Sequence, residues 1–64
     1  MKQISIKLDN RATVKGFPGD YRARIKKGEV FEVERELNSV YHAKRIDGST
    51  TATYIIQKQY AREV

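Results

Sequence analysis

Apolar and polar residues alternate with a period of two in the middle of the chain, the pattern of a β-strand with one face in water. The segment opens after Gly28 in the turn Lys26-Lys27-Gly28. Phe31, Val33 and Leu37 then fall on one side, and the glutamates at the even-numbered positions between them fall on the other. We expect this segment to form a strand with Phe31, Val33 and Leu37 on one face and the glutamates on the face in water.

The same alternation recurs in short segments along most of the chain. Alternating segments, or segments rich in β-branched and aromatic residues, cover residues 4–8, 12–15, 21–25, 40–46 and 50–56. Asp9-Asn10 favours a turn, and Asp47-Gly48 is typical of a two-residue hairpin. Residues 57–60 fit one helical turn, and residues 61–64 fit a short last strand. The sequence therefore predicts an all-β fold with five to six short strands and a one-turn helix before the last strand.

The apolar positions of these segments define an expected core, which has to be thin. A 64-residue chain forms a single domain, residues 1–64, that buries only about 60% of the surface its unfolded form exposes. Such a core is too small to enclose a deep substrate pocket, so we expect a protein without enzymatic activity. The expected core residues are Ile4, Ile6, Leu8, Val14, Ile25, Phe31, Val33, Ile46 and Ile55, together with Tyr54 or Ile56.

The order of these segments is typical of an SH3-like barrel. The stretches that carry this resemblance are residues 27–33, Tyr41, Asp47-Gly48 and residues 54–64. They resemble the small SH3-like proteins that Gram-positive bacteria and their phages encode, which implies a fold and, for most members, no assigned activity. The closing segment is also similar to the end of eukaryotic SH3 domains, which bind proline-rich peptides with a Trp and an acidic loop. This chain has no Trp, and its corresponding loop is basic.

Composition restricts the compartment and the charge of the partner. The chain has no Cys, which fits a reducing compartment such as the cytoplasm, and we expect neither a signal peptide nor a membrane segment. The net charge is +5, but residues 1–28 carry a net +6 and residues 29–64 a net −1. A basic half of this kind favours nucleic acid or another acidic partner, whereas solubility alone is the simpler explanation.

The basic residues gather in a long loop, residues 11–27, that the sequence predicts to be a bent hairpin. Arg22 and Arg24 share the face opposite Tyr21 and Ile25, and Phe17 stands at the tip, where its ring either stacks on a partner or folds back onto the core. The candidate binding residues are Arg11, Lys15, Phe17, Arg22, Arg24, Lys26 and Lys27.

Catalytic and metal sites are not expected. His42 lies in mid-strand, and Ser39 and Asp47 flank that strand at opposite ends, too far apart for a catalytic triad. The glutamates of residues 29–36 follow one strand and do not converge as metal ligands must, so we expect them to pair with Lys44, Arg45 or Lys58. No cofactor and no small-molecule substrate is expected.

Two functions remain open from the sequence. The first is a binding module that contacts nucleic acid through the basic loop. The alternative is a protein-interaction module that binds a host protein through the loop tip and through exposed tyrosines such as Tyr41 and Tyr60. Either module would act as a monomer or a weak dimer.

Overall fold

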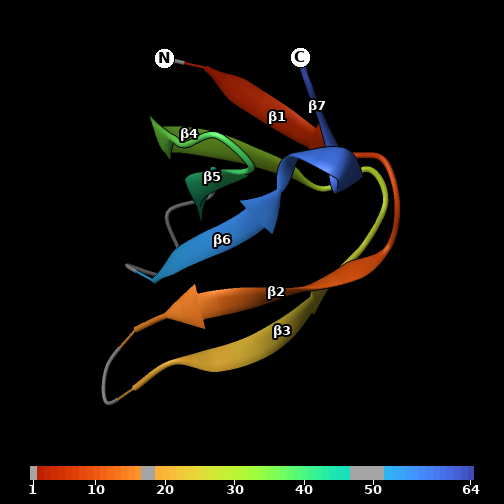
Figure 1. Ribbon diagram of the computed structural model, residues 1–64. Coiled ribbons are helices and arrows are strands. Elements are labelled where there is room, and N and C mark those ends of the chain that lie inside the picture. The colour runs from red at the N-terminus through yellow and green to blue at the C-terminus, as the bar shows by residue number, and fades with distance from the viewer. Residues whose placement is uncertain (1, 17–18, 47–51) are drawn as a thin grey trace.

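The computed structural model describes residues 2–16, 19–46 and 52–64, and these residues form an all-β fold (Figure 1). The elements are β1 (Gln3–Ile6), β2 (Asn10–Lys15), β3 (Tyr21–Ile25), β4 (Val30–Glu36), β5 (Val40–Arg45), β6 (Thr53–Gln57), the 3-10 helix η1 (Lys58–Tyr60) and β7 (Ala61–Glu63). The one-turn helix before the last strand is confirmed. The expected five to six strands are too few, because both arms of the hairpin in residues 11–27 are strands of the sheet.

All neighbouring strands pair antiparallel in one sheet of order β3-β2-β6-β5-β4-β1-β7. β1 pairs with both β4 and β7, so the first and last strands of the chain lie side by side (Figure 1). The hairpin of β2 and β3 joins the sheet through β6. β3 and β7 are the two edges, and the sheet is not closed into a complete barrel.

The core lies on one face of this strongly bent sheet. Eight of the expected core residues are buried, including both Tyr54 and Ile56, and Phe31 is packed against Tyr54 with ring centroids 5.1 Å apart. The predicted burial of Leu8 and Ile46 is wrong, since these side chains are 55% and 51% exposed. Leu8 lies two residues after the end of β1 and Ile46 lies one residue after the end of β5, where the chain leaves the sheet. The buried set is Ile4, Ile6, Ala12, Val14, Ile25, Phe31, Val33, Tyr41, Ala43, Ala52, Tyr54, Ile56 and Ala61.

A β-bulge corrects the predicted alternation of β4. The register with β5 shifts between Val33 and Arg35, which moves every later side chain to the other face of the strand. Glu36 consequently lies opposite the buried Tyr41, and Leu37, predicted to share the face of Phe31 and Val33, is 36% exposed. An insertion of one residue leaves no mark in a simple period-two pattern, so the sequence does not predict it.

The core face of β6 is also different from the predicted one. Ile56 is fully buried, whereas Ile55 is only partly buried and lies opposite Thr13 and His42 on the outer face. Because Tyr54, Ile55 and Ile56 are all apolar, composition does not distinguish the two faces of this strand. Packing against β2 and β5 decides that Tyr54 and Ile56 point inward.

The turn between β3 and β4 contains a glycine with positive φ and is held by two hydrogen bonds to the segment that follows β1 and to its last residue. Gly28 has a φ of 96°, a left-handed conformation that glycine adopts without strain. Its N–H donates to the carbonyl of Ile6, and the N–H of Lys27 donates to Asp9 Oδ1 at 2.7 Å. The turn is thereby tied to the end of β1. The predicted Asp47-Gly48 turn lies outside the described residues.

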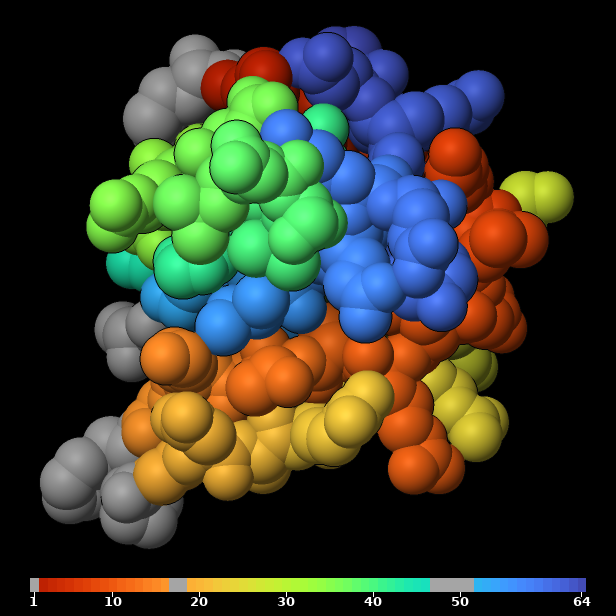
Figure 2. All heavy atoms as spheres, in the orientation of Figure 1, coloured from red at the N-terminus to blue at the C-terminus, as the bar shows by residue number. Residues whose placement is uncertain are grey.

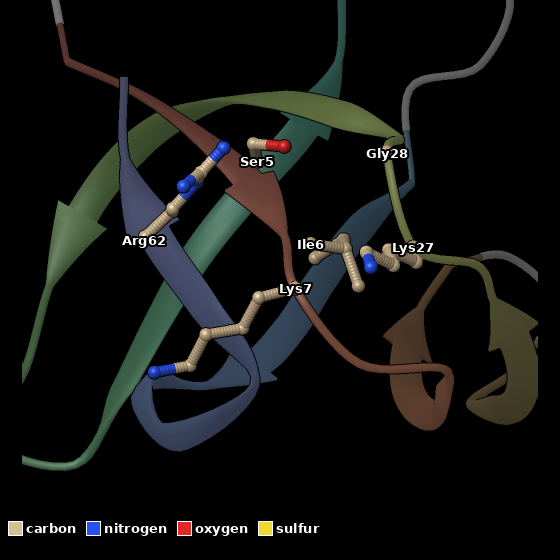
Figure 3. A pocket seen from close by; sticks show the side chains of 6 residues that line it. All are labelled: Ser5, Ile6, Lys7, Lys27, Gly28 and Arg62. Atoms are coloured by element: carbon tan, nitrogen blue, oxygen red, sulfur yellow. The ribbon is translucent and has the colours of Figure 1, made fainter.

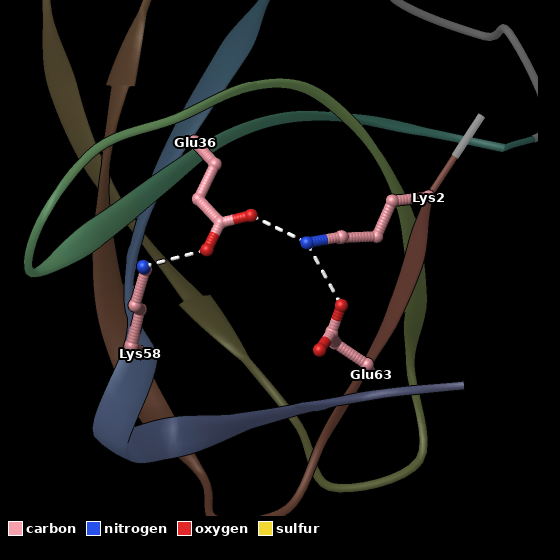
Figure 4. Close-up of polar contacts among 4 residues, drawn as sticks. All are labelled: Lys2, Glu36, Lys58 and Glu63. Carbon is pink, nitrogen blue, oxygen red and sulfur yellow. Dashed lines mark hydrogen bonds and ion pairs between the residues drawn. The ribbon is translucent and has the colours of Figure 1, made fainter.

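Glu36 is the centre of an ion-pair network that joins both ends of the chain (Figure 4). Its carboxylate accepts from Lys2 Nζ and from Lys58 Nζ, and Lys2 also pairs with Glu63 at 2.8 Å. Hydrogen bonds from Lys2 and then Lys58 lower the pKa of Glu36 from 4.5 to about 2. The hydrogen bonds to Glu36 and Glu63 raise the pKa of Lys2 above its ordinary value. The network follows from the bulge, which sets Glu36 beside these lysines.

We expect the Glu36 network to make folding stability depend on acid pH. A carboxylate with a lowered pKa in the folded state stabilises the fold above its unfolded pKa, and this contribution is lost as the pH falls from about 4.5 to about 2. Glu36→Gln should therefore lower the melting temperature at pH 7 and should flatten its fall between pH 5 and pH 2. Thermal unfolding followed by circular dichroism across this range measures both effects.

Glu32→Gln is the matched control, because it removes the same charge from the same strand. The structure shows no ion pair of Glu32 among the described residues. Equal acid profiles of the two variants would contradict the role assigned to Glu36. Since the groups are exposed, 1 M salt should shrink the difference between wild type and Glu36→Gln.

Candidate functional site

The outer face of β2 and β3 gathers four of the predicted binding residues. Ala12, Val14 and Ile25 point into the core, so the residues between them point outward. Arg11 lies directly opposite Arg24 in the strand pair, and Thr13 lies directly opposite Arg22. We call Arg11, Thr13, Lys15, Arg22 and Arg24 the hairpin face. The atoms of β2 and β3 form the lower margin of the molecule in Figure 2.

Two guanidinium groups thus stand on facing positions of one strand pair. Like charges directly opposite each other destabilise an antiparallel pair. The structure shows no ion pair of Arg11, Arg22 or Arg24 with any described residue. Arg11 and Arg24 also line a hollow of about 250 Å³ with Asp9 and Asn10, whose Nδ2 donates back to the Leu8 carbonyl. The arginines of the hairpin face therefore form no ion pair within the described chain, and Asp9 is the acidic residue that shares their hollow.

The cations at the other end of the sheet are in a different situation. As expected from the sequence, the glutamates near β4 pair with Lys44, Arg45 and Lys58. The Arg45 guanidinium also lies 5.3 Å from the Phe31 ring centroid and donates from Nε to Tyr54 Oη at 3.0 Å. Four of the 13 basic residues are in ion pairs within the described chain, and none of these four belongs to residues 7–27.

The other predicted site residues do not all join the hairpin face. Lys26 and Lys27 are exposed in the turn after β3, and Lys27 is held there by the backbone bond to Asp9. Phe17 lies outside the described residues. The structure thus brings together Arg11, Lys15, Arg22 and Arg24, and places Lys27 in a second group.

That second group includes two cations that the sequence analysis did not select. Lys7 and Arg62 line a hollow of about 370 Å³ together with Lys27, Ser5, Ile6 and Gly28 (Figure 3). We call it the β1–β7 hollow. Arg62 is placed there by the pairing of Ser5 with Arg62 across the first and last strands. No local pattern indicates this neighbourhood, because only the pairing of the two strands creates it.

Of the two tyrosines expected to be exposed, one is buried and the other is partly buried. Tyr41 is only 6% exposed, and Lys58 Nζ lies 5.3 Å from its ring centroid. Tyr60 is partly buried in η1. Tyr41 was predicted to be exposed because its strand was placed by sequence alone, whereas the register with β6 sets it opposite Ile56 on the core face. The loop tip at residues 17–18 lies outside the described residues.

The described residues contain no group of three or more His, Asp or Glu side chains arranged to hold a metal ion. His42 is partly buried in the middle of β5, as the sequence suggested. Within the described ranges no helix is long and apolar enough to cross a membrane.

Comparison with known protein-family models, with curated proteins and with solved structures gave no match for this chain. The hairpin face and the β1–β7 hollow are accordingly interpreted from their own geometry and charge.

Proposed function

We propose that this protein is a small binding module that contacts nucleic acid through the hairpin face. The observation that carries the proposal is the facing pair Arg11 and Arg24, flanked by Arg22 and Lys15 and without an acidic partner among the described residues. A phosphate backbone relieves the repulsion between such groups, and their binding releases counterions from the nucleic acid. Arginine and lysine contacts to phosphate position a protein without reading sequence.

The proposal includes an SH3-like arrangement of the strands. Its support is the pairing of β1 with both β4 and β7, and the 3-10 turn directly before β7. In this arrangement the β2–β3 hairpin corresponds to the loop that is acidic in eukaryotic SH3 domains and is basic in this chain. The charge of that hairpin is the reason for proposing a polyanion as the partner.

Salt dependence tests the proposed function. Four phosphate contacts by the hairpin face should give a slope of about −3 to −4 when the logarithm of the association constant for duplex DNA is plotted against the logarithm of salt concentration. Fluorescence anisotropy measures this slope with a labelled duplex, a single DNA strand and an RNA strand. The salt concentration is varied from roughly 25 to 200 mM, a range over which the screening of charges changes strongly. Absence of salt-dependent binding to all three would refute the proposal.

That negative result would favour the protein-partner alternative. An interface centred on aromatic residues is expected to keep its affinity when salt is raised, because its energy comes from buried apolar area. The burial of Tyr41 removes one of the two tyrosines on which that alternative rested.

A further inference from the structure

The β1–β7 hollow is a second basic site, and it shares no residue with the hairpin face. Its lining includes three basic residues, Lys7, Lys27 and Arg62, and no acidic residue. The structure shows no ion pair of any of the three with a described residue. They come from the end of β1, the β3–β4 turn and β7, so three separate segments bring positive charge to one hollow.

The acidic residues that lie near the lining residues in the sequence do not line the hollow themselves. Glu63, which follows Arg62, pairs with Lys2 on the other side of β7. Asp9 accepts the backbone N–H of Lys27, and Glu29 pairs with Arg45. Three basic residues and no acidic residue line the hollow, and in Figure 3 the side chain of Lys7 extends away from Lys27 while that of Arg62 extends toward Ser5.

Backbone amides at the hollow are already used. The N–H of Ile6 donates to the backbone carbonyl of Glu29, that of Lys7 to the carbonyl of Tyr60 and that of Gly28 to the carbonyl of Ile6. An anion in the hollow would therefore be held by side chains, by the ammonium groups, the guanidinium and the Ser5 hydroxyl. Figure 3 shows Arg62 directed toward Ser5, its partner across the strand pair.

We infer that the β1–β7 hollow binds a doubly charged phosphate monoester. Three cations in one concave site exceed what the single charge of a backbone phosphodiester balances, whereas a monoester carries about −1.5 to −2 at pH 7. The inference rests on the proposed function in one respect, because it takes the monoester to be the phosphorylated end of a nucleic-acid strand. A free mononucleotide has the same chemistry and is the other source.

Oligonucleotides of one sequence that carry a 5′-phosphate, a 3′-phosphate or hydroxyl groups at both ends test this inference. A strand with an end phosphate should bind about fivefold more tightly than the hydroxyl strand in 50 mM salt, a gain of the size that one or two exposed ion pairs supply. Lys7→Gln with Arg62→Gln should abolish this preference. Binding of the hydroxyl strand, which depends on the hairpin face, should fall much less. Isothermal titration calorimetry measures each affinity.

The matched control is Arg35→Gln with Lys44→Gln, which removes the same charge from residues of β4 and β5 that line neither the hollow nor the hairpin face. This variant should keep the preference for the phosphorylated end. Equal affinity of the wild type for phosphorylated and hydroxyl strands would overturn the inference and leave the proposed function standing.

Titration with adenosine monophosphate separates the two sources. If no strand binds but the mononucleotide shifts the amide resonances of Ser5 and Gly28, the monoester site stands and the proposed function falls. If neither strand nor mononucleotide produces an effect at the hollow, the inference is overturned as well.

Discussion

Replacement of Ile56 by alanine is expected to lower the free energy of unfolding by about 2–5 kcal/mol, the usual cost of this truncation in a core. The side chain is fully buried on the inner face of β6. A domain of this size has a total stability of roughly 3–10 kcal/mol, so the variant should be largely unfolded or should melt tens of degrees lower. Urea and thermal unfolding followed by circular dichroism measure the change.

The preceding residue supplies the matched control. Ile55 has the same chemical structure but lies on the outer face of β6, opposite Thr13 and His42. Ile55→Ala should cost no more than about 1 kcal/mol, because less apolar area leaves water there on folding. If Ile55→Ala were the more damaging of the two, β6 would be shifted by one residue against its neighbours.

Reversal of the charges on Arg11 and Arg24 is expected to weaken binding to nucleic acid strongly. At 50 mM salt each lost phosphate contact weakens association about tenfold, so Arg11→Glu with Arg24→Glu should lose at least about a hundredfold and should reduce the salt slope by about two. The fold should tolerate the change, since two like charges still face each other across the strand pair.

The single reversal Arg24→Glu tests whether the facing arginines serve binding at a cost in folding stability. It places opposite charges across β2 and β3, which should raise the free energy of unfolding by about 0.2–1 kcal/mol. Affinity for nucleic acid should fall at the same time. A variant that is more stable but binds less well would show that the repulsion is kept for binding. Loss of stability in this variant would contradict the facing geometry.

Arg35→Glu with Lys44→Glu is the control for net charge. Both residues lie away from the hairpin, Lys44 on the second and Arg35 on the third strand from β2 in the sheet. At about 4.8 Å between strands, the nearer lies roughly 10 Å away, where exposed charges are largely screened at 0.1 M salt. This variant should bind only modestly less well. A loss equal to that of the hairpin variant would mean that net charge alone drives association.

Much of the fold can be read from local pattern. Period-two alternation predicts the strands, because a side chain on a half-buried sheet meets either core or water and each choice appears directly in the residue type. Local sequence also predicted the one-turn helix before β7 and the pairing of the glutamates with Lys44, Arg45 and Lys58. The outward face of Arg22 and Arg24 also follows, since they alternate with Ala23 and Ile25.

Tertiary structure decided what local pattern leaves undetermined. The bulge in β4 turns Leu37 outward and brings Glu36 to Lys2, and a one-residue insertion has no signature in the sequence. The choice between Ile55 and Ile56 depends on the packing of neighbouring strands. Lys7 and Arg62 share a hollow only because the first and last strands pair, and contacts between residues so distant in sequence are set by the whole sheet. Residue type alone determined which side chains carry charge, and the pairing of strands determined which of those charges meet.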